Sequence, residues 1–374
     1  MPITIGALRE DAPGETRVSL VPEVAEKFAQ AGARILIERG AGDRAQFGDA
    51  LYRKVEWADS AAAVLAQADV LLAVRPLSPA QIGQLKPGAV VVGYMQAHEK
   101  RAEVKALCER RITSFAMEFV PRISRAQSMD ALSSQAAIAG YKAVLIAANT
   151  LDKFLPMLTT AAGTIRPATV LVIGVGVAGL QAIATAKRLG AVVEAYDVRS
   201  ATKEQVKSLG AKFIDTGVSA EGQGGYAREL TAEEKAKQKE VLDARIAAAD
   251  AVICTAGVPG RRAPLIITRD AIERMKQGAV IVDIVAEHGG NCELTKYGET
   301  LVHQGVRIVG PVNLPGQLAY NASEMYARNL LNFLKPAIDK GELKIDWNDE
   351  VFAQSCLTHE GAVRHEATRK ALES

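Results

Sequence analysis

The segment PRISRAQSMDALSS, residues 121–134, holds the densest group of side chains that could act on a ligand. Arg122 offers a guanidinium, Gln127 an amide and Asp130 a carboxylate. Ser133 adds a hydroxyl. The segment contains no His, Cys or Lys to carry protons in acid–base catalysis. Arg125 and Ser134 belong to the same group, whose chemistry is suited to holding and orienting a ligand.

Three residues of this segment also have simpler interpretations. Asp130 could be a general base, but a carboxylate so near Arg122 and Arg125 is more simply an orienting group in an ion pair. Ser133 and Ser134 could cap the helix predicted to follow them.

The stretch TVLVIGVGVAGLQAIATAKRLGA has the order of a nucleotide-binding turn. An apolar strand leads into Gly174, Gly176 and Gly179, and a helix pattern follows. Gly174 would permit the tight turn, Gly176 would let a pyrophosphate approach the backbone, and Gly179 would let the helix pack closely on the strand. The sequence therefore predicts one dinucleotide site, with no metal.

Asp197 ends the next predicted strand, roughly 20 residues after the first glycine, where an acid bonds the adenosine ribose. A carboxylate there repels a 2′-phosphate, so NAD(H) is the predicted cofactor. Arg199 leaves an alternative open, because an arginine at this place can pair with that phosphate.

Residues 167–186 form an uncharged stretch of about the length that spans a bilayer. The glycines interrupt it, its first half is β-branched and its second half has helical composition. Strand, turn and helix are therefore predicted here, and not a membrane span.

Composition narrows the class of protein. The 45 basic and 43 acidic side chains nearly cancel, so no nucleic-acid partner is expected. The four cysteines form no C-x-x-C pair, which argues against a disulfide framework or a zinc site. The N-terminus, MPITIGALRED, lacks the apolar region of a signal peptide, so a cytoplasmic protein is expected. The five histidines are expected to be exposed.

Short β-branched runs alternate with amphipathic segments in two successive sets. The predicted fold class is α/β: two Rossmann-like, doubly wound parallel-sheet domains linked by long helices. The first domain is predicted to comprise residues 1–132 and 321–374, and the nucleotide-binding domain residues 133–320. A long helix follows the polar segment, and a later one returns the chain to the first domain, with Ser323 as its N-cap.

Residues 217–240 combine a glycine-rich half with a charged helical half. The first half is poor in large apolar side chains and cannot bury much surface. It is either a mobile loop tipped by Tyr226 or a solvated linker, and the sequence favours neither.

Four segments together resemble a known family. They are GETRVSLVPEV, PRISRAQSMDALSSQ, GVGVAG and AEHGGNC. With them the chain is similar, over nearly its whole length, to the NAD(H)-binding component of proton-translocating transhydrogenases, in the form made as a separate soluble subunit. That family shares a superfamily with alanine dehydrogenase.

The resemblance implies direct hydride transfer from NADH on this chain to NADP on a partner subunit, with proton movement in a membrane-spanning subunit. It implies a homodimer, held peripherally at the inner face of the membrane and inactive without its partners. Arg122, Gln127, Asp130 and Ser133 match the family's RQDS element, which holds the nicotinamide end of the cofactor, so the resemblance makes them the predicted catalytic residues. Tyr226 matches the tyrosine of the family's mobile loop. The predicted cofactor contacts are Gly174, Val175, Gly176, Val177, Ala178, Gly179, Asp197, Val198, Arg199, Gly225, Tyr226 and Ala256.

The alternative function is that of an alanine-type amino-acid dehydrogenase. Arg17 matches that enzyme's carboxylate-binding arginine, but Val74 stands at the place of its substrate lysine and Gln96 at that of its catalytic histidine. A one-residue slip would let Arg75 compensate in part. Glu287 stands where the enzyme keeps an acid. A third hypothesis is a non-catalytic NAD-responsive binding module.

Overall fold

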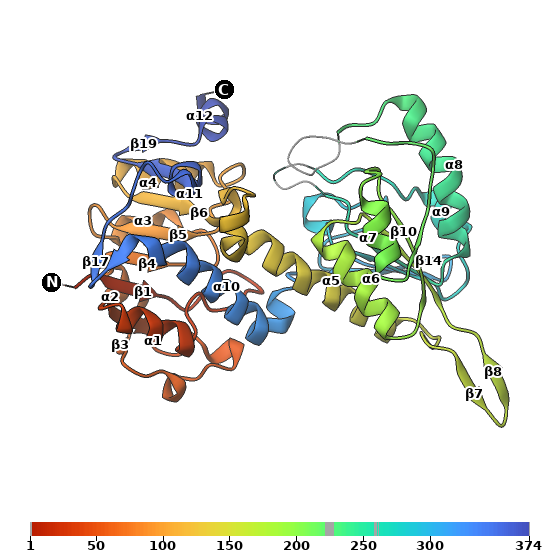
Figure 1. Ribbon diagram of the computed structural model, residues 1–374, viewed down its shortest axis with the longest axis horizontal. Coiled ribbons are helices and arrows are strands. Elements are labelled where there is room, and N and C mark those ends of the chain that lie inside the picture. Colours follow the sequence, from red (N-terminus) through yellow and green to blue (C-terminus); the bar gives the residue numbers. More distant parts are fainter. Residues whose placement is uncertain (1, 221–227, 258–259, 261, 374) are drawn as a thin grey trace. The chain divides into compact units, whose positions relative to one another are not determined.

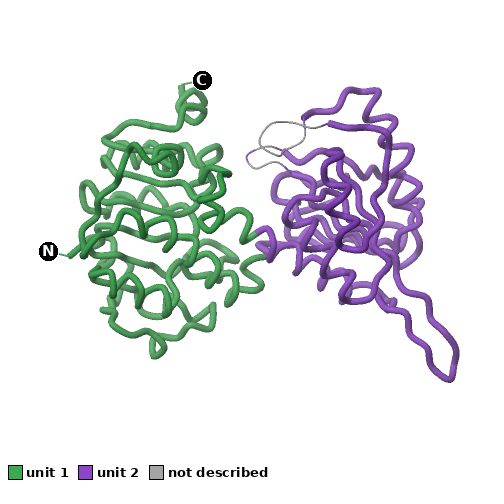
Figure 2. Tube along the Cα trace, viewed as in Figure 1, with its two compact units in different colours: residues 1–135, 315–374 green, residues 136–314 purple. Residues whose placement is uncertain are grey.

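The structure is a computed structural model that describes residues 2–220, 228–257, 260 and 262–373. The chain forms two compact units (Figure 2). Unit 1 comprises Met1–Gln135 and Pro315–Ser374, and unit 2 comprises Ala136–Leu314. Each unit is a Rossmann-like α/β sandwich, so the predicted fold class is confirmed.

Unit 1 is built on an eight-stranded sheet in the order β19-β18-β6-β5-β4-β1-β2-β3 (Figure 1). Strands β1 to β6 are parallel, whereas β18 is antiparallel to both of its neighbours, β6 and β19. The strands are β1 (Thr4–Ala7), β2 (Arg34–Glu38), β3 (Glu56–Ala58), β4 (Val70–Leu72), β5 (Val90–Gly93), β6 (Thr113–Ala116), β18 (Cys356–His359) and β19 (Ala362–Val363). The helices are α1 (Pro22–Gln30), α2 (Ala61–Leu65), α3 (Pro79–Gln84), α4 (Arg101–Glu109), α10 (Ala319–Leu334), α11 (Glu350–Ser355) and α12 (Glu366–Glu373).

The apolar runs of unit 1 supply both faces of this sheet, because successive side chains of a strand point to opposite sides. Val70 and Leu72 of β4 enter one core, together with residues of α1 and α10. Leu71 enters the other core, which α2, α3 and α4 help to cover. Burial on both faces explains why these strands are continuously hydrophobic.

Unit 2 has a seven-stranded sheet in the order β11-β10-β9-β12-β13-β15-β14, with only β14 antiparallel to its neighbour among these strands. Its strands are β9 (Thr169–Ile173), β10 (Val192–Tyr196), β11 (Lys212–Phe213), β12 (Ala251–Cys254), β13 (Val280–Asp283), β14 (Thr300–His303) and β15 (Val306–Val309). Its helices include α6 (Val177–Arg188), α7 (Thr202–Ser208), α8 (Ala232–Ala248) and α9 (Arg269–Glu273). The strand order reverses at β9, and ligands of such sheets bind at this switch point.

The uncharged stretch 167–186 forms β9, a turn and the start of α6, as predicted. A different helix, α5 (Ala131–Thr150), begins in unit 1 and continues into unit 2. Among the described residues it alone is long and apolar enough to cross a membrane, judged by length and composition, and 44% of its apolar window is buried in the protein. Ala143, Val144 and Ala147 of α5 belong to a core of unit 2. After α5 a short hairpin, β7 (Leu158–Thr160) and β8 (Gly163–Ile165), projects from unit 2 (Figure 1).

The second long helix, α10, lies wholly in unit 1, so the chain has already returned before it begins. It starts at Ala319, with Leu318 as its N-cap residue. The prediction that Ser323 is the N-cap is therefore wrong. Ser323 is fully buried, and its hydroxyl accepts the N–H of Val18 at 3.0 Å. The Ser323 hydroxyl thus stabilises the loop between β1 and α1, and not the start of its own helix.

Half-buried carboxylates accept hydrogen bonds from the loops that follow the strands of unit 1. Glu118 accepts the N–H of Met95 at 3.0 Å and that of Gln96 at 2.6 Å, just beyond β5. Gln96 has a left-handed φ of 46°, a conformation that side chains other than glycine seldom adopt. Burial raises the pKa of Glu118 from 4.5 to about 7.

Glu118→Gln should therefore change the pH dependence of stability. A carboxyl whose pKa is raised on folding stabilises the protein below its unfolded pKa, and this contribution is lost as pH rises through the folded value of about 7. We expect the free energy of unfolding of the variant, relative to the parent, to increase between about pH 5 and pH 8. Urea unfolding across this range measures the difference, and a difference independent of pH would contradict the assignment.

Candidate functional site

The glycine turn of unit 2 has the geometry of a phosphate-binding turn. Gly174 has φ +92°, which suits only glycine, and its N–H donates to the carbonyl of Tyr196 at 2.8 Å. A Cβ on Gly179 would lie 1.9 Å from the carbonyl oxygen of Gly174, so helix and strand pack too closely for a side chain. A Cβ on Gly176 would meet nothing within 4 Å.

The open space beside Gly176 lies at the N-terminus of α6, a helix of 12 residues whose N-cap residue, Gly176, provides no side-chain cap. Free N–H groups and the helix dipole at such a position attract a phosphate. Of the neighbouring predicted contacts, Val177 is exposed, Ala178 is half-buried and Val175 is buried. The residues present thus fit a dinucleotide without any cationic side chain.

A hydrogen-bond network that the sequence did not predict supports the glycine turn. Thr255 Oγ1 donates to the carbonyl of Gly174 at 2.8 Å. The Asn291 side chain accepts the N–H of Ala256 at 3.0 Å and donates to its carbonyl at 2.8 Å. Asp283, fully buried, accepts the N–H of Asn291 at 2.7 Å. The only sequence signal for this network is the AEHGGNC motif, in which Asn291 lies.

Asp197 is 7% exposed and accepts the N–H of Val175 at 2.7 Å, within the glycine turn. The guanidinium of Arg199 binds both carboxylate oxygens of Asp197, with Nε at 2.8 Å and Nη2 at 2.6 Å. In the sequence Asp197 favoured NAD(H) and Arg199 left NADP(H) open, but in the structure these two residues form an ion pair. Engaged in this way, Arg199 is not an independent cation.

The remaining predicted cofactor contacts of unit 2 lie outside the glycine turn. Val198 is half-buried, and its carbonyl accepts the N–H of Ala220 at 2.8 Å. Gly225 and Tyr226 lie outside the described residues. Glu287 is exposed. The charged half of residues 217–240 forms α8, as predicted, and its first turn is closed by a capping box of Thr231 and Glu234.

In unit 1 the polar segment 121–134 forms a 3-10 helix, η4 (Ser124–Met129), followed by α5. Its apolar residues Ala126 and Met129 are buried, whereas Arg122 and Gln127 are exposed. Gln127 makes no side-chain hydrogen bond with any residue that the structure describes. Its amide is therefore available to a ligand.

Asp130 caps α5 instead of pairing with Arg125. Its carboxylate accepts the N–H of Ser133 at 2.9 Å and the hydroxyl of Ser133 at 2.6 Å. Of the two arginines near Asp130 in the sequence, Arg125 is not its ion-pair partner, because Arg125 donates to both carboxylate oxygens of Asp349, at the start of α11. Arg122, Gln127, Asp130 and Ser133 thus lie within one short turn and helix start.

Arg17 lies in a buried ion pair of unit 1. Its Nε and Nη2 donate to Glu15 at 2.8 and 2.7 Å, and its Nη1 donates to Gln135 at 2.9 Å. Burial opposes the charge of Glu15, but hydrogen bonds from Arg17 hold its pKa at about 2. Val74 is buried and Gln96 carries no ionisable group, so neither position supplies a proton donor.

The histidines do not form a catalytic group. His98 is exposed, as predicted, but the other four are partly buried, so that expectation is wrong for them. His303 lies 2.9 Å from Glu273, and His365 stacks on Phe119. No group of three or more His, Cys, Asp or Glu suited to a metal occurs within the described ranges.

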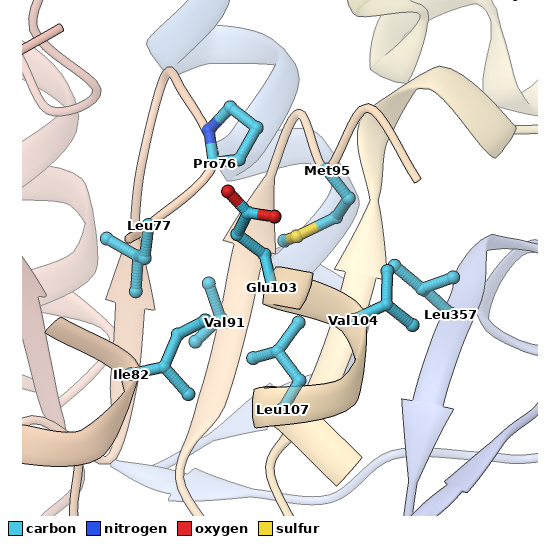
Figure 3. Close-up of a pocket in the computed structure, with 9 residues that line it drawn as sticks. All are labelled: Pro76, Leu77, Ile82, Val91, Met95, Glu103, Val104, Leu107 and Leu357. Carbon is cyan, nitrogen blue, oxygen red and sulfur yellow. The ribbon is translucent and has the colours of Figure 1, made fainter. Parts of the chain in front are cut away.

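A small apolar cavity in unit 1 is separate from these residues (Figure 3). Side chains of α3, α4 and β5 line it, including Ile82, Val91 and Leu107, with Glu103 the one acid at its edge. It contains none of the predicted site residues.

Comparison with known proteins agrees with these geometries. Residues 6–139 match the family model "Alanine dehydrogenase/PNT, N-terminal domain", and residues 143–366 match "Alanine dehydrogenase/PNT, C-terminal domain". The chain belongs to the alanine dehydrogenase/PNT family.

Within the alanine dehydrogenase/PNT family the chain is similar to the first part of NAD(P) transhydrogenase subunit alpha of Rhodospirillum rubrum, at 47% identity over 96% of this chain and 97% of that protein. It is similar to the crystal structure of transhydrogenase from Sinorhizobium meliloti, at 44% identity with a TM-score of 0.88 over 96% of this chain and 99% of that one. An L-alanine dehydrogenase structure shares the fold, with a TM-score of 0.82 at 23% identity over 99% of both chains. The resemblance expected from the sequence is confirmed.

Two alanine substitutions separate nucleotide binding from folding. Gly176→Ala should leave stability nearly unchanged, because its Cβ meets no atom, yet it should weaken NADH binding roughly tenfold, or about 1.4 kcal/mol, by filling the phosphate approach. Gly179→Ala should destabilise the protein by about 1–3 kcal/mol, because the Cβ overlaps the Gly174 carbonyl. NADH fluorescence titration and urea unfolding measure both effects. Parent-like NADH affinity in Gly176→Ala would contradict this account of the turn.

Proposed function

We propose that this chain is the NAD(H)-binding component of a proton-translocating transhydrogenase. It would bind NAD(H) at the glycine turn of unit 2 and support direct hydride transfer with NADP(H) held by a partner subunit. The observation that carries the proposal is the segment 121–134, in which amide, guanidinium and hydroxyl groups occur without His, Cys or Lys. The names of the relatives from Rhodospirillum rubrum and Sinorhizobium meliloti support it.

The chemistry explains why such a segment suffices. Oxidation of an alcohol or amine needs a base for the O–H or N–H proton, in addition to the hydride acceptor. Transfer between two nicotinamides moves hydride alone. The protein must then hold the reacting carbons about 3–3.5 Å apart with their orbitals aligned, which is a task of positioning.

Each predicted catalytic residue has a role consistent with this task. Gln127 and Arg122, both exposed, would contact the nicotinamide end of the cofactor. Asp130 and Ser133 bond to each other at the start of α5, so they would shape the turn that presents Gln127. Asp130 in this arrangement is an acceptor of two hydrogen bonds and not a free base.

The cofactor preference is proposed to be NAD(H) over NADP(H). A carboxylate at Asp197 suits ribose hydroxyls and repels a 2′-phosphate. Arg199 binds that carboxylate and so holds it in place, which removes the main argument for a phosphate site. Gly225 and Tyr226 are proposed to belong to a loop that folds over the bound cofactor.

The assembly is proposed by analogy with the family. The partners are an NADP(H)-binding subunit and a membrane-spanning subunit in which protons move, and this chain would form a homodimer at the cytoplasmic face of the membrane. Alone it would bind NAD(H) but complete no reaction. Mixing the purified chain with the NADP(H)-binding subunit, and following reduction of an NAD analogue by NADPH, tests the proposal directly.

The same mixture distinguishes the alternatives. Turnover of L-alanine with NAD⁺ by the chain alone would establish an amino-acid dehydrogenase. NADH binding without hydride transfer to the partner's nucleotide would leave a non-catalytic binding module. Either result would overturn the transhydrogenase assignment.

Gln127→Asn should slow hydride transfer strongly, by roughly a hundredfold if the shorter side chain misplaces the nicotinamide by about 1 Å. The NADH dissociation constant should change little, because the nucleotide is held mainly by unit 2. Stopped-flow absorbance and NADH fluorescence measure the two quantities. Ser124→Ala is the matched control, since Ser124 is exposed on the same turn and makes no side-chain hydrogen bond with the described residues. Equal losses of rate and affinity in Gln127→Asn would refute the positioning role.

A further inference from the structure

We propose that Asn329 of α10 is a positioning residue for the segment 121–134. The inference rests on the proposed function, since it concerns the turn that presents Gln127. Asn329 lies about 200 residues further along the chain, and neither the sequence patterns nor the family resemblance assigns it a role.

Asn329 ties two points of the segment together. Its Nδ2 donates to the carbonyl of Ser128 at 2.9 Å, and its Oδ1 accepts the hydroxyl of Ser134 at 2.7 Å. Ser128 directly follows Gln127, and Ser134 lies one residue after the Asp130–Ser133 pair. One amide thus bonds to the segment directly after Gln127 and directly after Ser133, on either side of the Asp130–Ser133 pair.

The orientation of this amide is determined by its partners. The Ser128 carbonyl can only accept, so the NH2 group of Asn329 must face it. Asn329 is only 7% exposed, on a helix face shared with the fully buried Tyr326, Leu330 and Phe333. A leucine would pack on that face, whereas a buried amide is costly unless it is bonded. Its two hydrogen bonds to the segment therefore account for its polarity.

Two further contacts reach the segment from the C-terminal region of unit 1, but both are more exposed. Asn332 Nδ2 donates to the same Ser128 carbonyl at 3.2 Å. Arg125 is 47% exposed in its ion pair with Asp349. Exposed polar pairs contribute little to local order, because water competes for them. Asn329 is the buried member of the set.

Asn329→Asp tests the role, because it keeps the shape but places a carboxylate oxygen against the Ser128 carbonyl. Hydrogen exchange in the absence of nucleotide should show protection of the Asp130 and Ser134 amides falling roughly tenfold or more, as expected when a buried hydrogen bond is lost. With the partner subunit, the hydride-transfer rate should fall roughly tenfold or more through misplacement of the segment. The NADH dissociation constant should stay within about twofold, since the nucleotide turn lies in unit 2.

Asn332→Asp is the matched control, with the same substitution one turn along α10 and the same acceptor. It should change exchange and rate much less. Equal effects of the two substitutions would overturn the proposal. So would exchange in Asn329→Asp that rises throughout unit 1, because that result indicates a general structural role.

If Asn329→Asp does not fold, Ser134→Ala removes the second of the two Asn329 bonds, together with the contacts of the Ser134 hydroxyl with the Ala131 carbonyl and Gln135. It should lower protection of the same amides by a smaller factor. Unchanged protection in that variant would also overturn the proposal. The exchange measurement needs neither nucleotide nor partner. Absence of hydride transfer in the parent protein would therefore refute the proposed function without deciding the role of Asn329.

Discussion

The loops that leave the carboxyl ends of parallel strands expose backbone N–H groups, and each such group needs an acceptor. In unit 1 the carboxylates of Glu10 and Glu118 supply acceptors beyond β4 and β5. In unit 2 Asp283 does so beyond β13, and Asp197 accepts one N–H of the glycine turn. The N-cap residue of α6, Gly176, provides no side-chain acceptor for the first turn of that helix. An anionic ligand would complete the pattern there.

The two functional segments are held by different means. The glycine turn is fixed by backbone geometry, since Gly174 has a left-handed φ and Gly179 allows no side chain. The polar segment has no such intrinsic constraint. The buried Asn329 of α10 bonds to it, and the exposed ion pair of Arg125 with Asp349 is a weaker contact. These anchors leave Gln127 exposed. A turn that is fixed by hydrogen bonds from a neighbouring helix can present a polar side chain without using that side chain for its own stability.

The fold by itself does not distinguish a transhydrogenase component from an amino-acid dehydrogenase, because the L-alanine dehydrogenase structure shares it. The distinction depends on a few side chains. Val74 and Gln96 offer no proton donor, and the buried Arg17 is bound by Glu15. The amide, guanidinium and hydroxyl groups of segment 121–134 are suited to orienting a ligand. Hydride transfer between two nicotinamides requires such orientation and no general base.

Local patterns in the sequence were enough to predict the α/β class, the strand, turn and helix around Gly174, and the long helix that begins at Ala131, because periodicity and glycine geometry act over a few residues. They did not predict that Arg125 pairs with Asp349 or that Ser323 bonds to Val18. Nor did they reveal Asn329. These partners lie hundreds of residues apart, and only the packing of α10 and α11 against the N-terminal sheet brings them within hydrogen-bond distance. Sequence spacing determines which groups are available, whereas tertiary structure decides which of them meet.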